Sequence, residues 1–407
     1  MSLTDRLIMS ALVDPMKSDL HLSDSAIGVL QGIVFAVVYA CAGLVLGRAA
    51  DRQRRLTILL VGATTWCLAT IACGLATSYW QLVLARALVG IGEAALAPAA
   101  VSIVADSFPP ARRGTATSVF FVGSYIGAPV SIAVGGVMLG LAQGGSFSGV
   151  PMIGDISPWR MVLVIVGVAG MVVPVLLLSL REPNRQDRPR AETLGVMIRH
   201  FVTDWRMLAP LYLAIGLMNI GDYGMFAWFP TVLSRQFAIP PKEIGQWFGI
   251  LTAATGILGC LVAGPASDLI ARAVGVRGRL FLPLAAALIA SAGALLIAKG
   301  DAGAVFSGLA LWVFFSAISN IAGIAALQAV IPSRYNGVGI ALLAFCNVML
   351  GLGLGPVLVP LVTEHVYCDP LLVGWAVATV AASAAILAAL LFLVSSLGLS
   401  RRRLGPD

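Results

Sequence analysis

Four charged side chains near the start of the chain fall inside stretches that are otherwise apolar or small. Asp5 and Arg6 lie close to the N-terminus, and Arg86 and Glu93 lie within an apolar run from about 82 to 104. A charge at the centre of a bilayer costs roughly 2.5–3.5 kcal/mol on insertion scales. These groups therefore need partners from other helices. A carboxylate whose surroundings change can also bind and release a proton.

The composition indicates a membrane protein. Hydrophobic residues make up 59% of the 407 residues and charged residues only 11%, whereas soluble domains carry roughly 25% charged residues. The cysteines and histidines show no metal-ligand spacing, so we expect no metal and no cofactor other than a coupling proton. No P-loop or G-x-S-x-G motif occurs, and we expect no enzymatic activity.

Apolar runs of about 20 residues recur along the chain and predict an all-α polytopic protein with twelve transmembrane helices. The runs cover about 1–15, 26–48, 57–77, 80–105, 114–141, 159–180, 207–233, 244–267, 279–298, 303–331, 337–363 and 371–398. The first is shorter than a membrane span requires, so we expect the first helix to be truncated at its N-terminus. The predicted domains are a six-helix bundle over 1–181, a cytoplasmic linker with a short interfacial helix over 182–205, a six-helix bundle over 206–400 and a basic tail over 401–407.

The positions of lysine and arginine predict the orientation. With both termini in the cytoplasm, 19 of the 26 basic residues fall in inner loops or the tail, five fall in outer loops, and Arg6 and Arg86 lie in the membrane. This asymmetry follows the positive-inside rule. It accounts for the net charge of +7 without a nucleic-acid partner. We expect a monomer in a bacterial inner membrane.

The two halves of the sequence resemble each other. Several identical residues are separated by the same 217 positions: Asp5 and Asp222, Gly47 and Gly264, Asp51 and Asp268, and Arg55 and Arg272. Repeated matches at one offset indicate a duplicated six-helix unit. Parallel repeats of this kind are typical of transporters that hold substrate near the bilayer midplane and work by alternating access.

A motif in the loop after the second apolar run resembles a family signature. Gly47-x-x-x-Asp51-Arg52-x-x-Arg55 resembles the loop signature of the major facilitator superfamily, and Gly264-x-x-x-Asp268 resembles its weaker second copy. We expect Gly47 to permit close approach of a neighbouring helix. The resemblance implies a cytoplasmic latch between the halves, made by the residues Gly47, Asp51, Arg52, Arg55, Arg113, Gly264 and Asp268.

Residues in the fourth apolar run resemble one particular branch of this superfamily. Arg86-x-x-x-Gly90-x-Gly-Glu93, together with Asp5-Arg6, is similar to the spinster-like branch of sphingolipid and lysolipid transporters. That branch implies proton-coupled transport of a lipid-like amphiphile of lysolipid or sphingoid type. A carrier of small organic anions or drugs is the alternative within the class. A non-transporting membrane sensor or a scramblase-like lipid protein is the alternative outside it.

The charged residues are expected to form one coupling site. At 1.5 Å per helical residue, Glu93 lies roughly 20 Å from the outer end of its helix, near the midplane. We predict that Asp5, Arg6 and Glu93 form a cluster with Arg86 nearer the outer surface, and that Asp5 is the first choice for the proton site. The alternative is a structural ion-pair network. Asp222 has three open roles: coupling, cavity polarity or a hydrogen bond between helices.

The C-terminal half is predicted to supply most of an amphiphile's apolar contacts. The candidate polar cavity residues are Tyr125, Asn219, Asn320 and Asn347, and the candidate apolar ones are Met218, Phe226, Trp228, Phe345 and Met349. We expect a polar head to lie against the N-terminal half and the tail against the C-terminal half.

Overall fold

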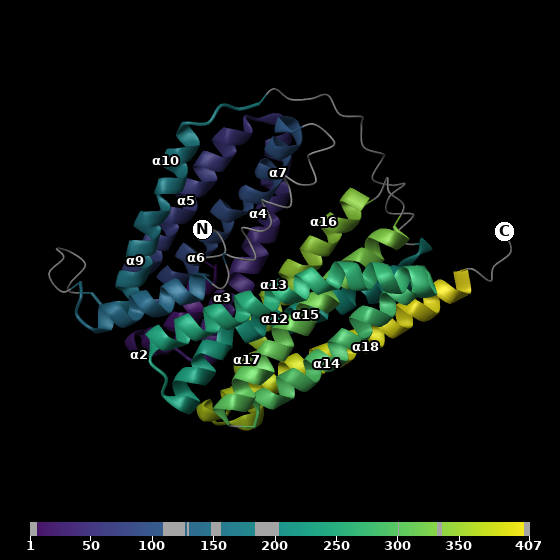
Figure 1. Ribbon diagram of the computed structural model, residues 1–407. Helices are drawn as coiled ribbons and strands as arrows, with labels where there is room; N and C mark the ends of the chain where they lie inside the picture. Colours follow the sequence, from purple (N-terminus) through teal and green to yellow (C-terminus); the bar gives the residue numbers. More distant parts are fainter. Residues whose placement is uncertain are drawn as a thin grey trace. The chain divides into compact units, whose positions relative to one another are not determined.

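The computed structural model describes residues 6–108, 127, 130–147, 156–183, 203–299, 301–331 and 336–402, and within these ranges it leaves out a few side chains. Every regular element in these ranges is a helix, and no strand occurs in them (Figure 1). The expected all-α class is confirmed. Contacts divide the chain into unit 1, residues 1–188 and 230–250, and unit 2, residues 189–229 and 251–407.

Unit 1 is built mainly from the N-terminal helices. They are η1 (Ile8–Leu12), α2 (Val13–Leu20), α3 (Asp24–Gln31), α4 (Ile33–Arg52), α5 (Arg55–Leu75), α6 (Tyr79–Ala94), α7 (Leu96–Ser107), α9 (Pro158–Gly170) and α10 (Val172–Leu178). A helix over Val130–Gln143 also belongs to this unit.

Unit 2 contains the C-terminal helices. They are α12 (Trp205–Phe237), α13 (Pro241–Val274), η2 (Val276–Leu280), α14 (Phe281–Ile297), α15 (Ala302–Val330), α16 (Asn336–Cys346), η4 (Asn347–Leu354), α17 (Gly355–Val362), η5 (Thr363–Tyr367), η6 (Pro370–Leu372) and α18 (Val373–Arg402). The last eight residues of α12 and the first turns of α13 belong to unit 1 by their contacts.

Within the described ranges, nine helices are long and apolar enough to cross a membrane. The chain is therefore a multi-pass membrane protein. Polar side chains begin several of these helices. Ser23 accepts a hydrogen bond from the Ala26 N–H at the start of α3, and Asp301 accepts one from the Ala304 N–H at the start of α15, each at 3.0 Å. Such caps satisfy backbone donors that the first helical turn leaves without a partner.

Several expected runs are interrupted. The second is divided at Gly32 into α3 and α4, and the fourth at Ala95 into α6 and α7. Pro98 lacks an N–H to donate to the carbonyl one turn earlier, which explains a break near that point. The eleventh run contains the π-helix η4, and π-helical turns are frequent at functional sites. The interfacial helix predicted in the linker lies outside the described residues.

Candidate functional site

The Arg6 side chain is paired with Glu93 inside unit 1. Arg6 Nε donates to Glu93 Oε2 at 2.6 Å, and the two side chains are 11% and 0% exposed. Glu93 lies in the last turn of α6, whereas Arg6 immediately precedes η1. The predicted association of Arg6 with Glu93 is present in the structure. Asp5, the first choice for the proton site, lies outside the described residues and its role stays a prediction.

A second guanidinium lies beside the first. Arg86 is 3% exposed, and its Nη2 donates to the backbone carbonyl of Arg6 at 3.1 Å. The described side chains of this cluster are therefore two guanidinium groups and one carboxylate. Guanidinium groups such as these can bind an anionic oxygen through charge-assisted hydrogen bonds.

Aromatic rings on α4 form one wall of the cluster. The Cζ atom of Arg6 lies 4.9 Å from the ring centre of Phe35 and 4.5 Å from that of Tyr39, and Arg86 Cζ lies 5.4 Å from Phe35. The two rings stack at 5.6 Å. Each cation–π contact contributes about 0.5–2 kcal/mol. These rings were not among the predicted site residues, although their spacing of four positions places them on one helix face.

A glycine explains how α6 approaches its neighbour. A Cβ atom at Gly92 would lie 2.6 Å from the backbone N of Trp66 and 2.6 Å from the carbonyl O of Gly62. Any larger side chain at Gly92 would push α6 away from α5. Gly92 therefore allows α6 to pack closely against α5, and this packing holds Glu93 in place next to Arg6.

Unit 2 contains its own buried carboxylate. Asp222 on α12 accepts hydrogen bonds from Trp312 Nε1 at 2.9 Å, Ser316 Oγ at 2.5 Å and Asn320 Nδ2 at 3.0 Å, all on α15. Each of these three donors is neutral. Of the roles left open for Asp222, a hydrogen bond between helices is directly present, and the arrangement is compatible with the other two.

A chain of amides extends this cluster to a third helix. Asn219 Nδ2 donates to Asn320 Oδ1 at 3.0 Å and lies 3.3 Å from Asn347 Oδ1. Asn347 is the first residue of the π-helix η4, and a Cβ atom at Gly351 in that helix would lie 2.7 Å from Asn219 Cβ. The three predicted asparagines are therefore brought together, and they bond to one another while remaining half-buried.

The predicted apolar cavity residues separate into two groups. Met218 and Trp228 are fully buried, and Trp228 Nε1 donates to the Pro356 carbonyl at 2.8 Å, which makes these two part of the packing of unit 2. Phe345 is 46% exposed, and Phe226 and Met349 are half-buried. Tyr125 lies outside the described residues.

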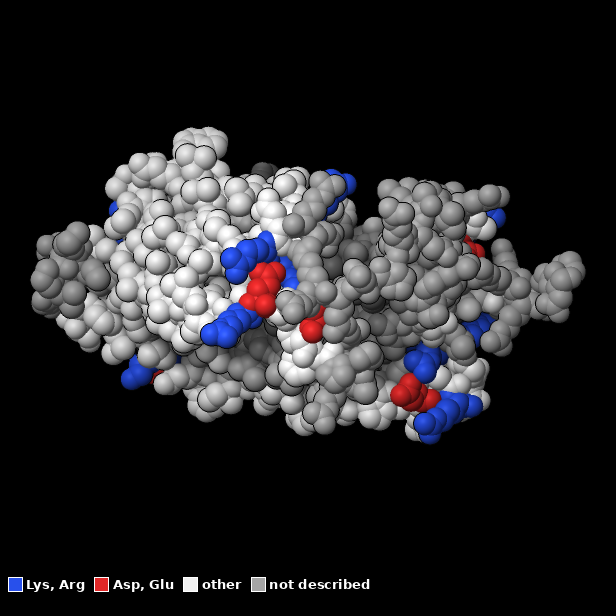
Figure 2. Space-filling view, turned by 90° about the horizontal axis from the view of Figure 1, so that it is seen from above, with Lys and Arg blue, Asp and Glu red and all other residues white. Residues whose placement is uncertain are grey.

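Arg55, one of the predicted latch residues, makes a buried ion-pair cluster within unit 1, and its part in a latch between the halves stays a prediction. It is 1% exposed, and its guanidinium bonds to Asp106 and to Ser102 on α7. Its Nε donates to Glu182 Oε1 at 3.1 Å, and its backbone N–H donates to the same oxygen at 2.8 Å. Arg55 thus ties α5 to α7 and to the segment after α10 within unit 1. Seen from above in Figure 2, basic and acidic side chains lie side by side in small groups on the surface.

The structure describes fewer contacts for the other predicted latch residues. A Cβ atom at Gly47 or Gly264 would have no described atom within 4 Å, so the close helix approach expected at Gly47 is absent from the described part. Asp268 accepts a hydrogen bond from Arg279 Nη2 at 2.8 Å, within unit 2. The side chains of Asp51 and Arg52 and all of Arg113 lie outside the described residues. For these three, the latch remains a prediction.

Sequence reasoning missed an ion-pair cluster around Arg235 in unit 1. Arg235 Nε donates to Asp14 Oδ1 at 2.9 Å, and its two terminal nitrogens donate to the two oxygens of Asp24 at 2.7 and 2.9 Å. Lys17 Nζ also donates to Asp24 Oδ1 at 2.9 Å. The sequence does place charged residues at the ends of the predicted helices. By themselves, those positions predict only the orientation of the helices in the membrane.

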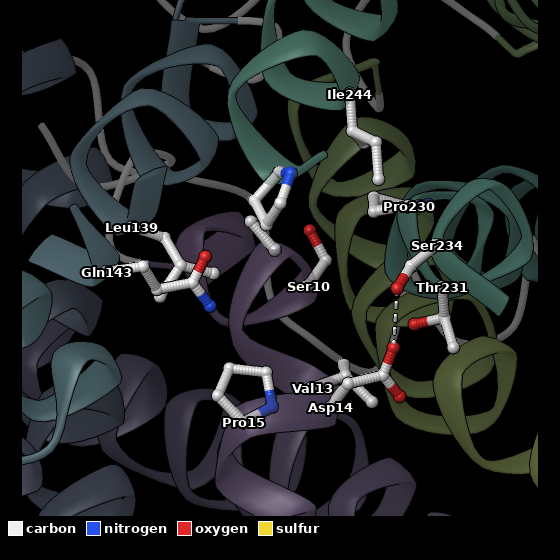
Figure 3. A pocket seen from close by; sticks show the side chains of 12 residues that line it. Ser10, Val13, Asp14, Pro15, Leu139, Gln143, Pro230, Thr231, Ser234 and Ile244 are labelled. Atoms are coloured by element: carbon white, nitrogen blue, oxygen red, sulfur yellow. Dashed lines mark hydrogen bonds between the residues drawn. The ribbon is translucent and has the colours of Figure 1, made fainter. Parts of the chain in front are cut away.

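A small cavity of about 230 Å³ adjoins this cluster (Figure 3). Ser234 Oγ donates to Asp14 Oδ2 at 3.0 Å along one side of the cavity, and Ser10 and Thr231 line it as well. The cavity is mixed in character, because Gln143, prolines and aliphatic side chains form the rest of its wall.

The sequence and the fold were compared with those of known proteins. The family model of the Major Facilitator Superfamily matches residues 1–356. An MFS-type efflux pump of Mycolicibacterium smegmatis is 29% identical over 377 residues, which are 90% of this chain and 82% of that protein. Protein spinster homolog 1 of Homo sapiens is 26% identical over 318 residues, 70% of this chain and 57% of that protein.

A sphingosine-1-phosphate transporter, SPNS2 of Xenopus tropicalis, is 28% identical over 282 residues, 65% of this chain and 51% of that protein. The chain thus spans about half the length of the spinster relatives it matches.

Solved structures share the fold. A bacterial homolog of the human lysosomal transporter Spinster, in an inward-facing and occupied conformation, superposes with a TM-score of 0.79 at 23% identity and covers 98% of this chain and 94% of that one. The nucleoside transporter NupG gives a TM-score of 0.70 at 12% identity, over 97% of this chain and 96% of that one. The chain belongs to the Major Facilitator Superfamily, whose members are membrane transporters and not enzymes, and it is similar to the spinster proteins of that superfamily.

Proposed function

We propose that this protein is a proton-coupled secondary transporter that moves an amphiphile with an anionic head by alternating access. The observation that carries the proposal is the buried pairing of Arg6 with Glu93, with a second guanidinium from Arg86 against the same backbone. Ionisable groups within membrane helices are expensive and mark substrate or ion pathways.

The geometry suggests how proton and cargo are coupled. Glu93 and an anionic head group compete for the same guanidinium of Arg6. When the head group takes Arg6, Glu93 loses the positive charge that balances it, and a proton that enters with the cargo restores the balance of charge. Proton and anionic cargo therefore bind together and move in the same direction. Asp5 is the second candidate for the proton.

The proposal that the cargo is an amphiphile is based on the proteins to which this chain is similar. Spinster proteins and sphingosine-1-phosphate transporters are among the proteins similar to this chain. A phosphate group on an apolar chain has the anionic head that the two arginines favour, since guanidinium groups bind phosphate oxygens through paired hydrogen bonds.

The Arg235 cluster supports alternating access. It joins the end of α12 to Asp14 on α2 and Asp24 on α3, at the end of these helices that the positive-inside rule assigns to the outer side. Alternating access requires the outer end to open, and opening there requires these ion pairs to separate. The topology proposed is an inner-membrane monomer with both termini in the cytoplasm.

A second candidate function is export of small organic anions or drugs. It is favoured by the M. smegmatis relative, described as an MFS-type efflux pump and matched over 90% of this chain. The same arginines would bind the anionic group of such a molecule.

Reconstituted proteoliposomes with a pH gradient test the proposal. We expect the gradient to drive flux of a fluorescent lysophosphatidic acid, and an enclosed pH dye to report proton movement in the same direction. Faster flux of a small aromatic carboxylate than of the lysolipid would favour the second function. Gradient-independent lipid exchange, or no flux of either probe, would favour a scramblase-like protein or a sensor.

A further inference from the structure

A groove in unit 2 lies where α12 begins and α18 ends. It has a volume of about 590 Å³ and is lined by residues 203–207, Pro210, Val394, Leu397 and Gly398. This size falls within the range of about 300–1,000 Å³ that is common for small-molecule sites. The groove shares no lining residue with the clusters around Glu93 and Asp222, and those clusters give it no role.

The lining of the groove combines charged and apolar side chains. Asp204 and Arg206 from the start of α12 are charged, and the Arg206 guanidinium Cζ lies 5.9 Å from the Trp205 ring. Val394 and Leu397 on α18 are aliphatic, and they are 47% and 49% exposed. The two helices are close to each other, because a Cβ atom at Gly398 would lie 3.5 Å from Met207 Cβ. A ligand that fits this lining has a charged head and a hydrocarbon chain.

The location indicates which lipid surface supplies such a ligand. α12 follows the arginine-rich linker, and three arginines, 401–403, follow in the sequence at the end of α18. The positive-inside rule places both ends at the cytoplasmic boundary of the bilayer. Trp205, which is 57% exposed, is a residue type enriched at this boundary. Basic pockets on this side of membrane proteins suit acidic lipid head groups.

The lining also favours a particular head group. Arg206 supplies a cation that can bind a phosphate. Thr203 and Asp204, which also line the groove, supply oxygen atoms that accept hydrogen bonds. A purely anionic head would be repelled by the Asp204 carboxylate. A phosphodiester that also carries hydroxyl groups satisfies both kinds of partner.

We propose that this groove binds an acidic glycerophospholipid of the cytoplasmic leaflet whose head carries hydroxyl groups, as phosphatidylglycerol does. Arg206 binds the phosphate, the oxygen atoms of Thr203 and Asp204 accept the hydroxyl protons, and the acyl chain lies along Val394 and Leu397. The site is independent of the cargo, so its failure would leave the transport proposal intact.

Native mass spectrometry of the full chain, released from nanodiscs of equal parts phosphatidylglycerol and phosphatidylcholine, tests the proposal. We expect retained phosphatidylglycerol in the wild type and about a tenfold weaker retention in Arg206→Gln. Arg272→Gln is the matched control, because it removes an exposed arginine of α13 elsewhere in unit 2. It should retain phosphatidylglycerol as the wild type does.

Three further measurements distinguish the lipid from other ligands. Leu397→Ser should weaken retention of phosphatidylglycerol, and phosphatidic acid should be retained less well than phosphatidylglycerol. Inorganic phosphate and glycerol phosphate should not displace the lipid. The proposal would be overturned by equal retention in Arg206→Gln and the wild type, by equal retention of phosphatidylcholine, or by displacement with inorganic phosphate, which would show a site for a free anion.

Discussion

Arg6 and Glu93 are 87 positions apart in the sequence, yet Arg6 Nε lies 2.6 Å from Glu93 Oε2. The pair joins the start of the chain to the end of α6 in a region that the Phe35 and Tyr39 rings shield on one side. Neither group could remain charged there alone at acceptable cost, because an isolated buried charge costs several kcal/mol. The pair is therefore both a structural contact and the most direct place to couple proton binding to transport.

Glu93→Gln should abolish proton-driven flux while leaving the protein folded. The amide still accepts a hydrogen bond from Arg6 but cannot bind a transported proton. Flux of the lysolipid probe with and without a pH gradient measures this, and Glu243→Gln, an exposed carboxylate at the start of α13, is the control. Normal gradient-driven flux in Glu93→Gln would move the coupling role elsewhere, with Asp5 the next candidate.

Arg55→Gln should destabilise the protein strongly. Removing one member of a buried ion pair costs about 3–5 kcal/mol, because the remaining charges, here Asp106 and Glu182, lose their partner. Arg54→Gln should cost about 0–1 kcal/mol, since the Arg54 side chain is 81% exposed. Thermal unfolding of the two variants in detergent gives the comparison. Equal midpoints would contradict the role of Arg55 as a tie within unit 1.

The free energy of unfolding should fall at acid pH, partly because the Glu182 carboxylate becomes protonated. Burial alone would raise the pKa of the Glu182 carboxyl, but hydrogen bonds from the Arg55 backbone and side chain and from the Leu56 N–H hold it below its usual value. A lowered folded-state pKa adds stability that is present above the unfolded-state pKa, about 4.5, and is lost as the pH falls through the folded-state pKa. Unfolding midpoints measured from neutral pH to below that pKa should fall less steeply in Glu182→Gln than in the wild type.

Asp222→Asn should be more damaging to stability than Ser316→Ala. The carboxylate accepts from three donors, and replacing one oxygen by an NH₂ group sets donor against donor in a buried site, which costs about 1–3 kcal/mol. Ser316→Ala removes one donor and adds none. Thermal unfolding measures both variants. If Asp222→Asn were as stable as the wild type but inactive, Asp222 would be assigned to coupling instead of helix packing.

Arg235→Gln should open the outer end of the structure. Asp14 and Asp24 would then lose the cation they share, and two carboxylates would face each other across the contact. A cysteine at Thr231, which is 2% exposed and lines the adjoining cavity, reports the change in a background without the native cysteines. Its labelling by a membrane-impermeant maleimide should accelerate at least about tenfold, a shift of about 1.4 kcal/mol. Lys242→Gln, at an exposed position nearby, should leave the rate unchanged.

The sequence alone determined the class of protein, the approximate spans and the members of the Arg6–Glu93 pair. Apolar run length, positive charge distribution and the cost of a buried charge are local properties, so they can be read from residue types and spacing. It also named Asn219, Asn320 and Asn347 as polar cavity residues, and the structure brings these three side chains together.

Only the tertiary structure decided which partners those groups take. The family resemblance predicted only that Arg55 belongs to a cytoplasmic latch, whereas packing of α5 against α7 shows that it is buried among carboxylates of its own unit. Asp14 and Asp24 were separated from Arg235 by more than 200 positions, and no periodicity links them. Side chains this far apart along the chain meet only once helices pack. For that reason, the ion-pair cluster around Arg235 and the groove between α12 and α18 could be found only in the tertiary structure.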